Sequence, residues 1–167
     1  MSFMLGHRSR GELHGVHDDL VFLVERAITI TPVDFSVHDG LRSVAEQRNY
    51  VASGVSKTMR SYHLPQHPEG RGWAVDLVPY INRKLRWEWK PLYRIATAMH
   101  EVANEYEIEL RWGAVWDRVF NNLDASDIES EVRLYVDRRR SVGKSAFLDG
   151  PHYELYREGH HQWGRLS

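Results

Sequence analysis

The chain has 167 residues, of which 42% are hydrophobic and 27% are charged, and it contains no cysteine. This composition is typical of one folded domain, and the lack of cysteine excludes disulfides, thiol catalysis and thiolate metal sites. Because 22 basic residues balance 23 acidic ones, no net charge attracts the chain to nucleic acid or to a membrane surface.

Hydrophobic periodicity predicts the secondary structure. Apolar residues at helical spacing predict a helix at about 15–28, and Phe35 and Val37 alternate with polar residues as in a short strand. The elements predicted after these are a helix at 43–53, a loop at 55–72, a strand at 73–80, a helix at 90–106, a strand at 109–112, a charged helix at 126–140 and a strand at 152–156.

This order of elements favours an α+β domain. We expect a small mixed or antiparallel sheet with helices packed mainly on one face, and a doubly wound α/β sheet is the alternative. No internal repeat divides the chain, so residues 1–167 are expected to form a single domain.

Apolar runs long enough for a signal peptide or a membrane-spanning helix are missing from the sequence. The longest one is interrupted by Glu25 and Arg26. We therefore expect a chain that is made in the cytoplasm, without stable membrane association. Because its charges balance, we also expect no nucleic-acid partner. The three arginines at 138–140 are typical of a solvated helix face.

One aspartate occupies an unfavourable place. Asp76 stands between Val75 and Leu77 in the predicted strand, and burying an unpaired carboxylate there costs several kcal/mol. Histidines occur in two other segments, SYH at 61–63 and DGPHYEL at 149–155. Because two neutral imidazoles and one carboxylate form a common catalytic zinc set, a Zn²⁺ ion would explain why Asp76 is kept.

Two further carboxylates compete for the role of general base. Asp149 lies three positions before His152, an offset that can hold a carboxylate beside the water on a metal without ligating the metal. Glu154 lies two positions after His152, on the same face of the predicted strand. It is therefore either a rival base or a partner that orients an imidazole.

These segments resemble the M15 metallopeptidases, the D-alanyl-D-alanine carboxypeptidase-like group that includes phage L-alanyl-D-glutamate endopeptidases. The resemblance covers about residues 13–156. The motifs that carry it are SYH, GWAVDL, LRWGAVW and DGPHYEL, preceded by LRSVAEQRNYVASGVSKT, which is similar to the family's arginine- and glutamine-bearing helix. It implies the fold of that peptidase group.

The resemblance also implies a role for each site residue. The implied zinc ligands are His63, Asp76 and His152, with Asp149 as the general base. Arg42 or Gln47 would face the substrate, where an arginine helps to polarise the scissile carbonyl or to hold the substrate.

Ser61 and Trp112 are the other positions expected to contact substrate. Both lie inside motifs that carry the resemblance, SYH and LRWGAVW.

The chain departs from the family pattern at several places. Twelve residues separate His63 from Asp76, a longer spacing than in many relatives, and they introduce His67 as an alternative ligand and a loop, 64–73, that can fold over the cleft. The charged insertion 117–146 is expected to be either a lid or a surface decoration. His160 and His161 lie in the polar tail 157–167, and we expect them to be tail residues, the alternative being that one of them supports a ligand without binding the metal.

The resemblance implies a zinc peptidase that hydrolyses the stem peptides of peptidoglycan as a phage-type endolysin. The expected bond is L-Ala-D-Glu, and the alternatives are D-Ala-D-Ala carboxypeptidase or dipeptidase activity and a non-catalytic wall-binding protein. Such an enzyme accumulates in the host cytoplasm and reaches the periplasm and cell wall once the inner membrane is opened. A monomer is expected, because each copy carries a complete site.

Overall fold

A computed structural model describes residues 2–157 of the chain. Its α-helices are α1 (His7–Glu12), α2 (Asp18–Ile30), α3 (Val44–Ala52), α4 (Trp89–Glu105) and α5 (Ile128–Ser141). Its strands are β1 (Phe35–Asp39), β2 (Ala74–Ile81), β3 (Lys84–Leu85), β4 (Leu110–Trp112) and β5 (His152–Leu155), and two 3-10 helices, η1 (Phe120–Asn122) and η2 (Ala125–Asp127), precede α5.

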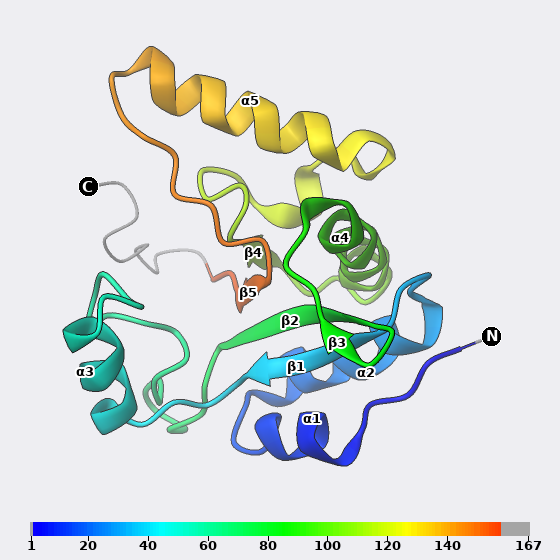
Figure 1. The fold of residues 1–167 in the computed structure, drawn as a ribbon, viewed down its shortest axis with the longest axis vertical. Helices are drawn as coiled ribbons and strands as arrows, with labels where there is room; N and C mark the ends of the chain where they lie inside the picture. The colour runs from blue at the N-terminus through cyan, green and yellow to red at the C-terminus, as the bar shows by residue number, and fades with distance from the viewer. Residues whose placement is uncertain (1, 158–167) are drawn as a thin grey trace.

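The strands form one antiparallel sheet in the order β1-β2-β5-β4, and β3 pairs with β2 as a short hairpin (Figure 1). The two central strands come from distant parts of the chain, so residues from both can meet on one face. The prediction of an α+β fold with a small antiparallel sheet is confirmed.

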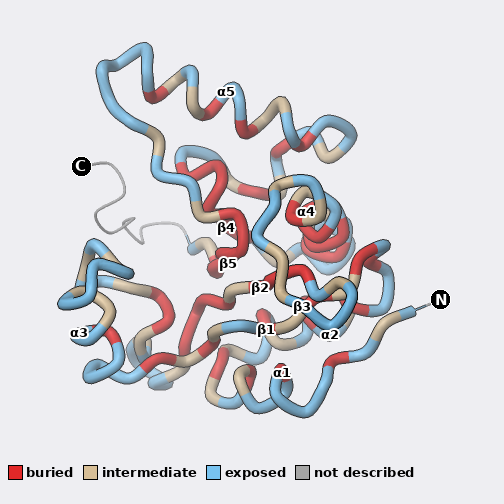
Figure 2. Tube along the Cα trace, viewed as in Figure 1, coloured by how far each residue is buried: buried red, intermediate tan, exposed pale blue. Residues whose placement is uncertain are grey.

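The core lies where helices cover the sheet. Helices α2 and α4 pack against each other, and α4 also contacts β2. Side chains alternate along a strand, so Val75 and Leu77 of β2 enter the core while Asp76 points to the opposite face. Buried residues concentrate in the sheet and in α4, whereas α3 is largely exposed (Figure 2).

One α-helix and one strand were not predicted from the sequence, nor were the 3-10 helices η1 and η2. Helix α1 has no stripe of apolar residues. It is anchored instead by a tertiary contact, a hydrogen bond of 3.0 Å from the Val37 N–H to Ser9 Oγ. Strand β3 has two residues and follows a turn in which Asn82 and Arg83 both have positive φ. Glycine is the usual residue at such a turn, so the sequence carries no signal for it.

The insertion 117–146 belongs to the packed body of the protein. Helix α5 contacts α4 and buries Ile128, Val132 and Tyr135 in the hydrophobic core. The segment is therefore attached to the core through one apolar face, and its role as a lid or a surface decoration stays a prediction.

The histidines at 160 and 161 lie outside the described residues. No helix in residues 2–157 is long and apolar enough to cross a membrane.

Candidate metal and catalytic site

The register of the sheet brings two of the expected ligands together. Asp76 of β2 is paired directly with His152 of β5. Side chains at directly paired positions of antiparallel strands are close neighbours. His152 Nδ1 accordingly lies 3.2 Å from Asp76 Oδ1.

The third expected ligand, His63, comes from the loop before β2. The turn that carries His63 is held by the His63 N–H, which donates to Ser61 Oγ at 3.2 Å, and by the Arg42 N–H, which donates to the His63 carbonyl at 2.8 Å. The imidazole is 3% exposed, and its Nε2 lies 3.3 Å from Asp76 Oδ1. Ligand atoms of His63, Asp76 and His152 all lie within 4.8 Å of one another.

In each imidazole, the ring nitrogen that does not face Asp76, here called the outer nitrogen, has a hydrogen-bond partner. His63 Nδ1 lies 2.7 Å from the Gly40 carbonyl oxygen, which only accepts, so Nδ1 carries the proton. His152 Nε2 lies 2.9 Å from Glu154 Oε2. Such partners orient metal-ligating histidines and fix their tautomers.

The ring nitrogens that face Asp76, here called the inner nitrogens, need a proton or a metal ion between them and the carboxylate. A neutral His63 with its proton on Nδ1 offers a lone pair at Nε2, and this lone pair faces a carboxylate oxygen of Asp76. Two acceptors in contact repel unless a proton or a metal ion lies between them. Two imidazoles and one carboxylate are a donor set that zinc commonly takes, so the residues fit the metal.

The ionisable groups of the metal-free site perturb one another. Burial alone would raise the pKa of Asp76, but His63 and His152 outweigh it and hold the pKa well below its usual value. Burial alone would lower the pKa of His152, but its bonds to Asp76 and Glu154 raise the pKa to about 10. His152 is therefore an imidazolium at neutral pH when no metal is bound.

Zinc binding at pH 7 is expected to release about one proton, because a metal displaces the proton on His152. The raised pKa of His152 keeps this proton bound from pH 6.5 up to about 10, so zinc affinity should rise with pH across that window. Calorimetric titration of the metal-free protein with Zn²⁺, in buffers of different ionisation enthalpy, measures the release. A binding heat that is independent of the buffer would contradict the expectation.

The turn before β5 places Asp149. The Asp149 N–H donates to the Gly113 carbonyl and the Gly113 N–H to the His152 carbonyl, both at 2.8 Å, while Trp112 Nε1 donates to the Gly150 carbonyl at 2.7 Å. A Cβ on Gly113 would lie 2.2 Å from the Asp149 carbonyl oxygen, so only glycine fits there. The pair Trp112 and Gly113 thus holds Asp149 and His152 in a fixed relation.

The Asp149 carboxyl lies in the electrostatic field of the ligand cluster. Burial and the negative charge of Asp76 raise the pKa of Asp149 to about 6, against the opposing charges of His152, His63 and Arg42. Asp149 is not part of the cluster that can hold a metal. Glu154 is buried and is bonded to the outer nitrogen of His152, which matches the orienting role rather than that of the base.

Arg42 is held rigidly beside the site. Its Nε donates to Asp39 Oδ2 at 3.0 Å, its Nη1 donates to Gln47 Oε1 at 2.6 Å, and its guanidinium lies 4.6 Å from the centre of the Tyr50 ring. Gln47 in turn donates to Ser56 Oγ at 2.9 Å. The capping box of Ser43 and Glu46 begins α3 and thereby sets the position of Gln47.

Two expected substrate contacts need correction. Gln47 and Trp112 are both 0% exposed, so neither reaches a substrate in this structure. Gln47 supports Arg42, and Trp112 stacks on Tyr153 and holds the turn at Gly150. Of the pair Arg42 and Gln47, the arginine is the one that lines the cleft.

A cleft of about 720 Å³ opens over these residues. Its walls come from the segments on both sides of the sheet end, α3 with the loop after it and the chain that follows α5 (Figure 1). Ser61, Arg42 and Asp149 line it together with the three candidate ligands.

The loop 64–73 does not line this cleft, so the expectation that it folds over the cleft is wrong. His67 is exposed and lines a smaller, separate pocket with His17 and Trp73.

Some residues of the cleft were not predicted from the sequence. Arg139 of α5 is 7% exposed and lines the cleft, which corrects the expectation that the three arginines form a solvated face. Phe147 and Leu148 add an apolar wall, and Trp87 with His38 adds another aromatic part. Only the short distance in sequence from Phe147 to Asp149 signals a place near the site.

Comparisons with known proteins point to one class of enzyme. A family model described as phage L-alanyl-D-glutamate peptidase matches residues 1–156. The chain is 30% identical over 159 residues to the L-alanyl-D-glutamate peptidase of Escherichia phage T5, an alignment that covers 93% of this chain and 99% of that protein. The crystal structure of the Serratia marcescens L-Ala D-Glu endopeptidase ChiX is similar with a TM-score of 0.65 and 34% identity, covering 92% of this chain and 90% of that one.

Proposed function

Since the chain belongs to the phage L-alanyl-D-glutamate peptidase family, we propose that it hydrolyses the L-Ala-D-Glu bond of peptidoglycan stem peptides as a zinc-dependent endolysin. The observation that carries the proposal is the cluster of His63, Asp76 and His152 on the floor of a cleft that Asp149 also lines. These residues come from three separate segments of the chain, so their convergence is a property of the fold.

The three ligands would hold one Zn²⁺ ion. Bound there, zinc supplies Lewis acidity, which lowers the pKa of a coordinated water toward ~7 and polarises a carbonyl group. His63 and His152 present their inner nitrogens because Gly40 and Glu154 engage the outer ones.

Asp149 acts as the general base and then as the general acid. Its carboxylate accepts a proton from the attacking water and delivers it to the nitrogen of the leaving D-glutamate. The clamp of Trp112 and Gly113 keeps this carboxylate beside the ligands during both transfers.

Arg42 supplies a fixed positive charge. Asp39 and Gln47 hold its guanidinium in place, so little reorganisation is needed when negative charge develops on the carbonyl oxygen. We propose that this guanidinium faces the substrate beside the reacting carbonyl.

In the proposed role the protein accumulates inside the host cell and meets its substrate when the inner membrane is opened. The substrate is then a stem peptide of the cell wall, and one copy of the chain suffices for hydrolysis because all the site residues named come from one chain.

Digestion of purified peptidoglycan tests the proposal. The zinc-loaded protein is incubated with peptidoglycan, and the products are analysed by mass spectrometry after labelling of free amino groups. We expect new amino groups on D-glutamate. EDTA should abolish their appearance, and added Zn²⁺ should restore it.

Other products would contradict the proposal. Released D-alanine would indicate a carboxypeptidase instead, and wall binding without any new amino group would indicate a non-catalytic protein.

A further inference from the structure

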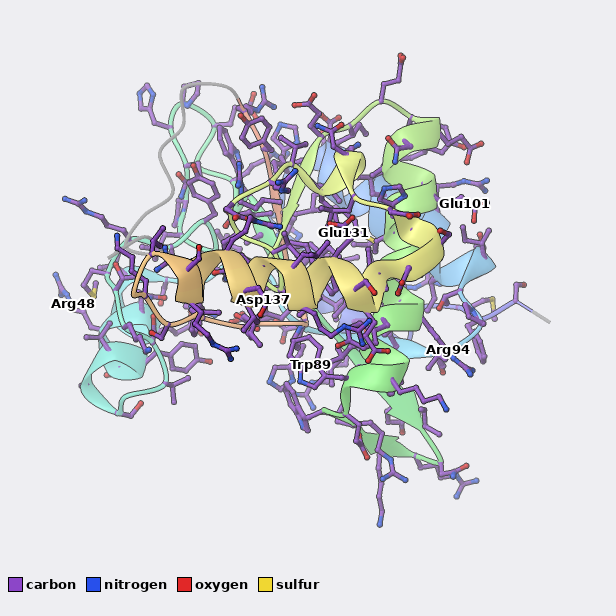
Figure 3. The ribbon with its side chains drawn as sticks, turned by 90° about the horizontal axis from the view of Figure 1, so that it is seen from above. Arg48, Trp89, Arg94, Glu101, Glu131 and Asp137 are labelled. Atoms are coloured by element: carbon purple, nitrogen blue, oxygen red, sulfur yellow. The ribbon has the colours of Figure 1, made fainter. Side chains whose placement is uncertain are left out.

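We propose that Arg139 is a specificity residue that binds a carboxylate of the peptide substrate; this inference rests on the proposed function. Arg139 lies in the last turn of α5, inside the insertion 117–146. It is 7% exposed and lines the same cleft as the candidate zinc ligands. In Figure 3, which views the molecule from above, α5 runs across the middle of the picture, and Asp137 lies closer than Glu131 to the side of Arg48.

The neighbours of Arg139 in the sequence show what is unusual about it. Arg138 donates to both carboxylate oxygens of Asp117 at 2.7 and 2.8 Å, and Arg140 lies 3.7 Å from Asp137. Both therefore have a carboxylate partner on the outside of the helix. Arg139 points inward, and within residues 2–157 no carboxylate lies within 4.0 Å of its guanidinium.

The guanidinium keeps free donors toward the cleft. Its Nε donates to the Ser145 carbonyl at 3.1 Å, which anchors the side chain without neutralising its charge. Within residues 2–157 its two terminal nitrogens make no hydrogen bond, and neither is a fully buried atom, so both keep some exposure in a side chain that lines the cleft. A buried charge without a counter-charge is unfavourable, and an anionic ligand would relieve it.

Arg42 is the natural comparison within the same cleft. It is similarly buried, but Asp39 already compensates its charge and Gln47 occupies Nη1. Of these two buried arginines among the described residues that line the cleft, Arg139 is therefore the one whose guanidinium still has donors for a ligand. Lys57 lines the cleft too, but it is exposed and lies 5.3 Å from the centre of the Phe147 ring.

The substrate chemistry matches such a group. A glutamate joined into a peptide through one of its two carboxyl groups keeps the other as an anion. The C-terminal carboxylate of a stem peptide is a second anion of the same kind. The planar fork of an arginine binds either one with two parallel hydrogen bonds.

Synthetic peptides that contain the L-Ala-D-Glu bond distinguish the two sources. One pair differs in the free glutamate carboxylate, which is replaced by a carboxamide, and a second pair differs in the same way at the C-terminus. We expect one of the two amidations to lower the kcat/KM of the wild-type protein by about 10- to 100-fold, the range of a charge-assisted hydrogen bond.

The Arg139→Gln variant should lose this preference, with a ratio near one for the two peptides of the pair. The ratio is taken within one preparation, so the folded fraction cancels. If Arg139→Gln is unfolded by circular dichroism, Arg139→Lys replaces it and should keep a weakened preference, because it retains the charge without the fork. Arg140→Gln, with an exposed side chain on the same turn, is the matched control and should behave as the wild type.

Each outcome decides between the alternatives. A wild-type ratio near one for both amidations, or a wild-type preference that persists in Arg139→Gln, would overturn the role of Arg139. If the wild type cleaves no peptide at all, the proposed function fails first and the inference falls with it.

Discussion

Replacement of His63 by alanine is expected to weaken zinc binding by about 100-fold or more and to abolish hydrolysis. The change removes Nε2, one of the inner nitrogens that face Asp76 Oδ1, and leaves two ligands where a catalytic zinc site needs three. Loss of an outer-shell partner alone costs 10- to 100-fold in metal affinity, so loss of a ligand should cost on the order of 100-fold or more. Equilibrium dialysis followed by zinc analysis measures the affinity, and release of amino groups from peptidoglycan measures the activity.

The matched control is His67→Ala. His67 belongs to the same loop but is exposed and lines the separate pocket near His17 and Trp73. This variant should keep both the metal and the activity. Loss of zinc in His67→Ala together with its retention in His63→Ala would reverse the assignment of the ligand.

Most of the fold could be predicted because its elements bury a regular apolar pattern. The stripe of Leu92, Ile95 and Met99 marks α4, and every predicted helix and strand is found with ends shifted by a few residues at most. Helix α1 and strand β3, which escaped prediction, have no such pattern. Contacts formed only after folding hold them in place, such as the bond from the Val37 N–H to Ser9 Oγ.

The cluster of candidate metal ligands could be predicted because Asp76 stands out in the sequence. Asp76 interrupts the apolar run between Val75 and Leu77, and in the structure it points to the face opposite theirs, where His63 and His152 meet it. The cluster of His63, Asp76 and His152 in the structure matches the ligand set that the sequence favours.

The substrate contacts could not be predicted in the same way, because they depend on which side of the packed structure a residue faces. Gln47 and Trp112 lie in motifs of the site yet are fully buried. Gln47 belongs to the nine-residue helix α3 and Trp112 ends the three-residue strand β4, and elements this short carry little periodicity. The sequence therefore does not distinguish a residue that contacts substrate from one that supports such a residue.

In the insertion 117–146, a residue that was expected to face solvent lines the cleft instead. Three consecutive charges read as a solvated face, but Arg139 is turned inward by a helix that packs on α4. That orientation depends on the burial of Ile128, Val132 and Tyr135, a pattern that a highly charged helix obscures in the sequence.

Replacement of Asp149 by asparagine is expected to lower kcat by about 10²- to 10⁴-fold while zinc binding is retained. Asparagine keeps the size of the side chain and the turn with Gly113, but it does not take up the proton of the attacking water. Zinc affinity should persist because Asp149 lies outside the cluster of His63, Asp76 and His152. Loss of zinc along with activity would mean that Asp149 is a ligand.

The dependence of activity on pH provides a second measurement. Burial and the charge of Asp76 raise the pKa of Asp149 to about 6 in the metal-free site, and a bound cation would lower it. A general base works only when it is deprotonated. Wild-type kcat/KM should therefore fall as the pH is lowered through the pKa that Asp149 has in the zinc-loaded site, which lies below the metal-free value of about 6. That acid limb should disappear from the residual activity of Asp149→Asn.

The control for the base is Glu154→Gln. Glu154 is bonded at 2.9 Å to the outer nitrogen of His152, so this change should weaken zinc binding by about 10- to 100-fold and leave kcat at saturating zinc far less affected. The two carboxylates are thereby separated by their effects, one on kcat and the other on metal affinity. If Glu154→Gln instead lowered kcat as strongly as Asp149→Asn at full zinc occupancy, Glu154 would be the base, and the clamp of Trp112 and Gly113 would only support the turn.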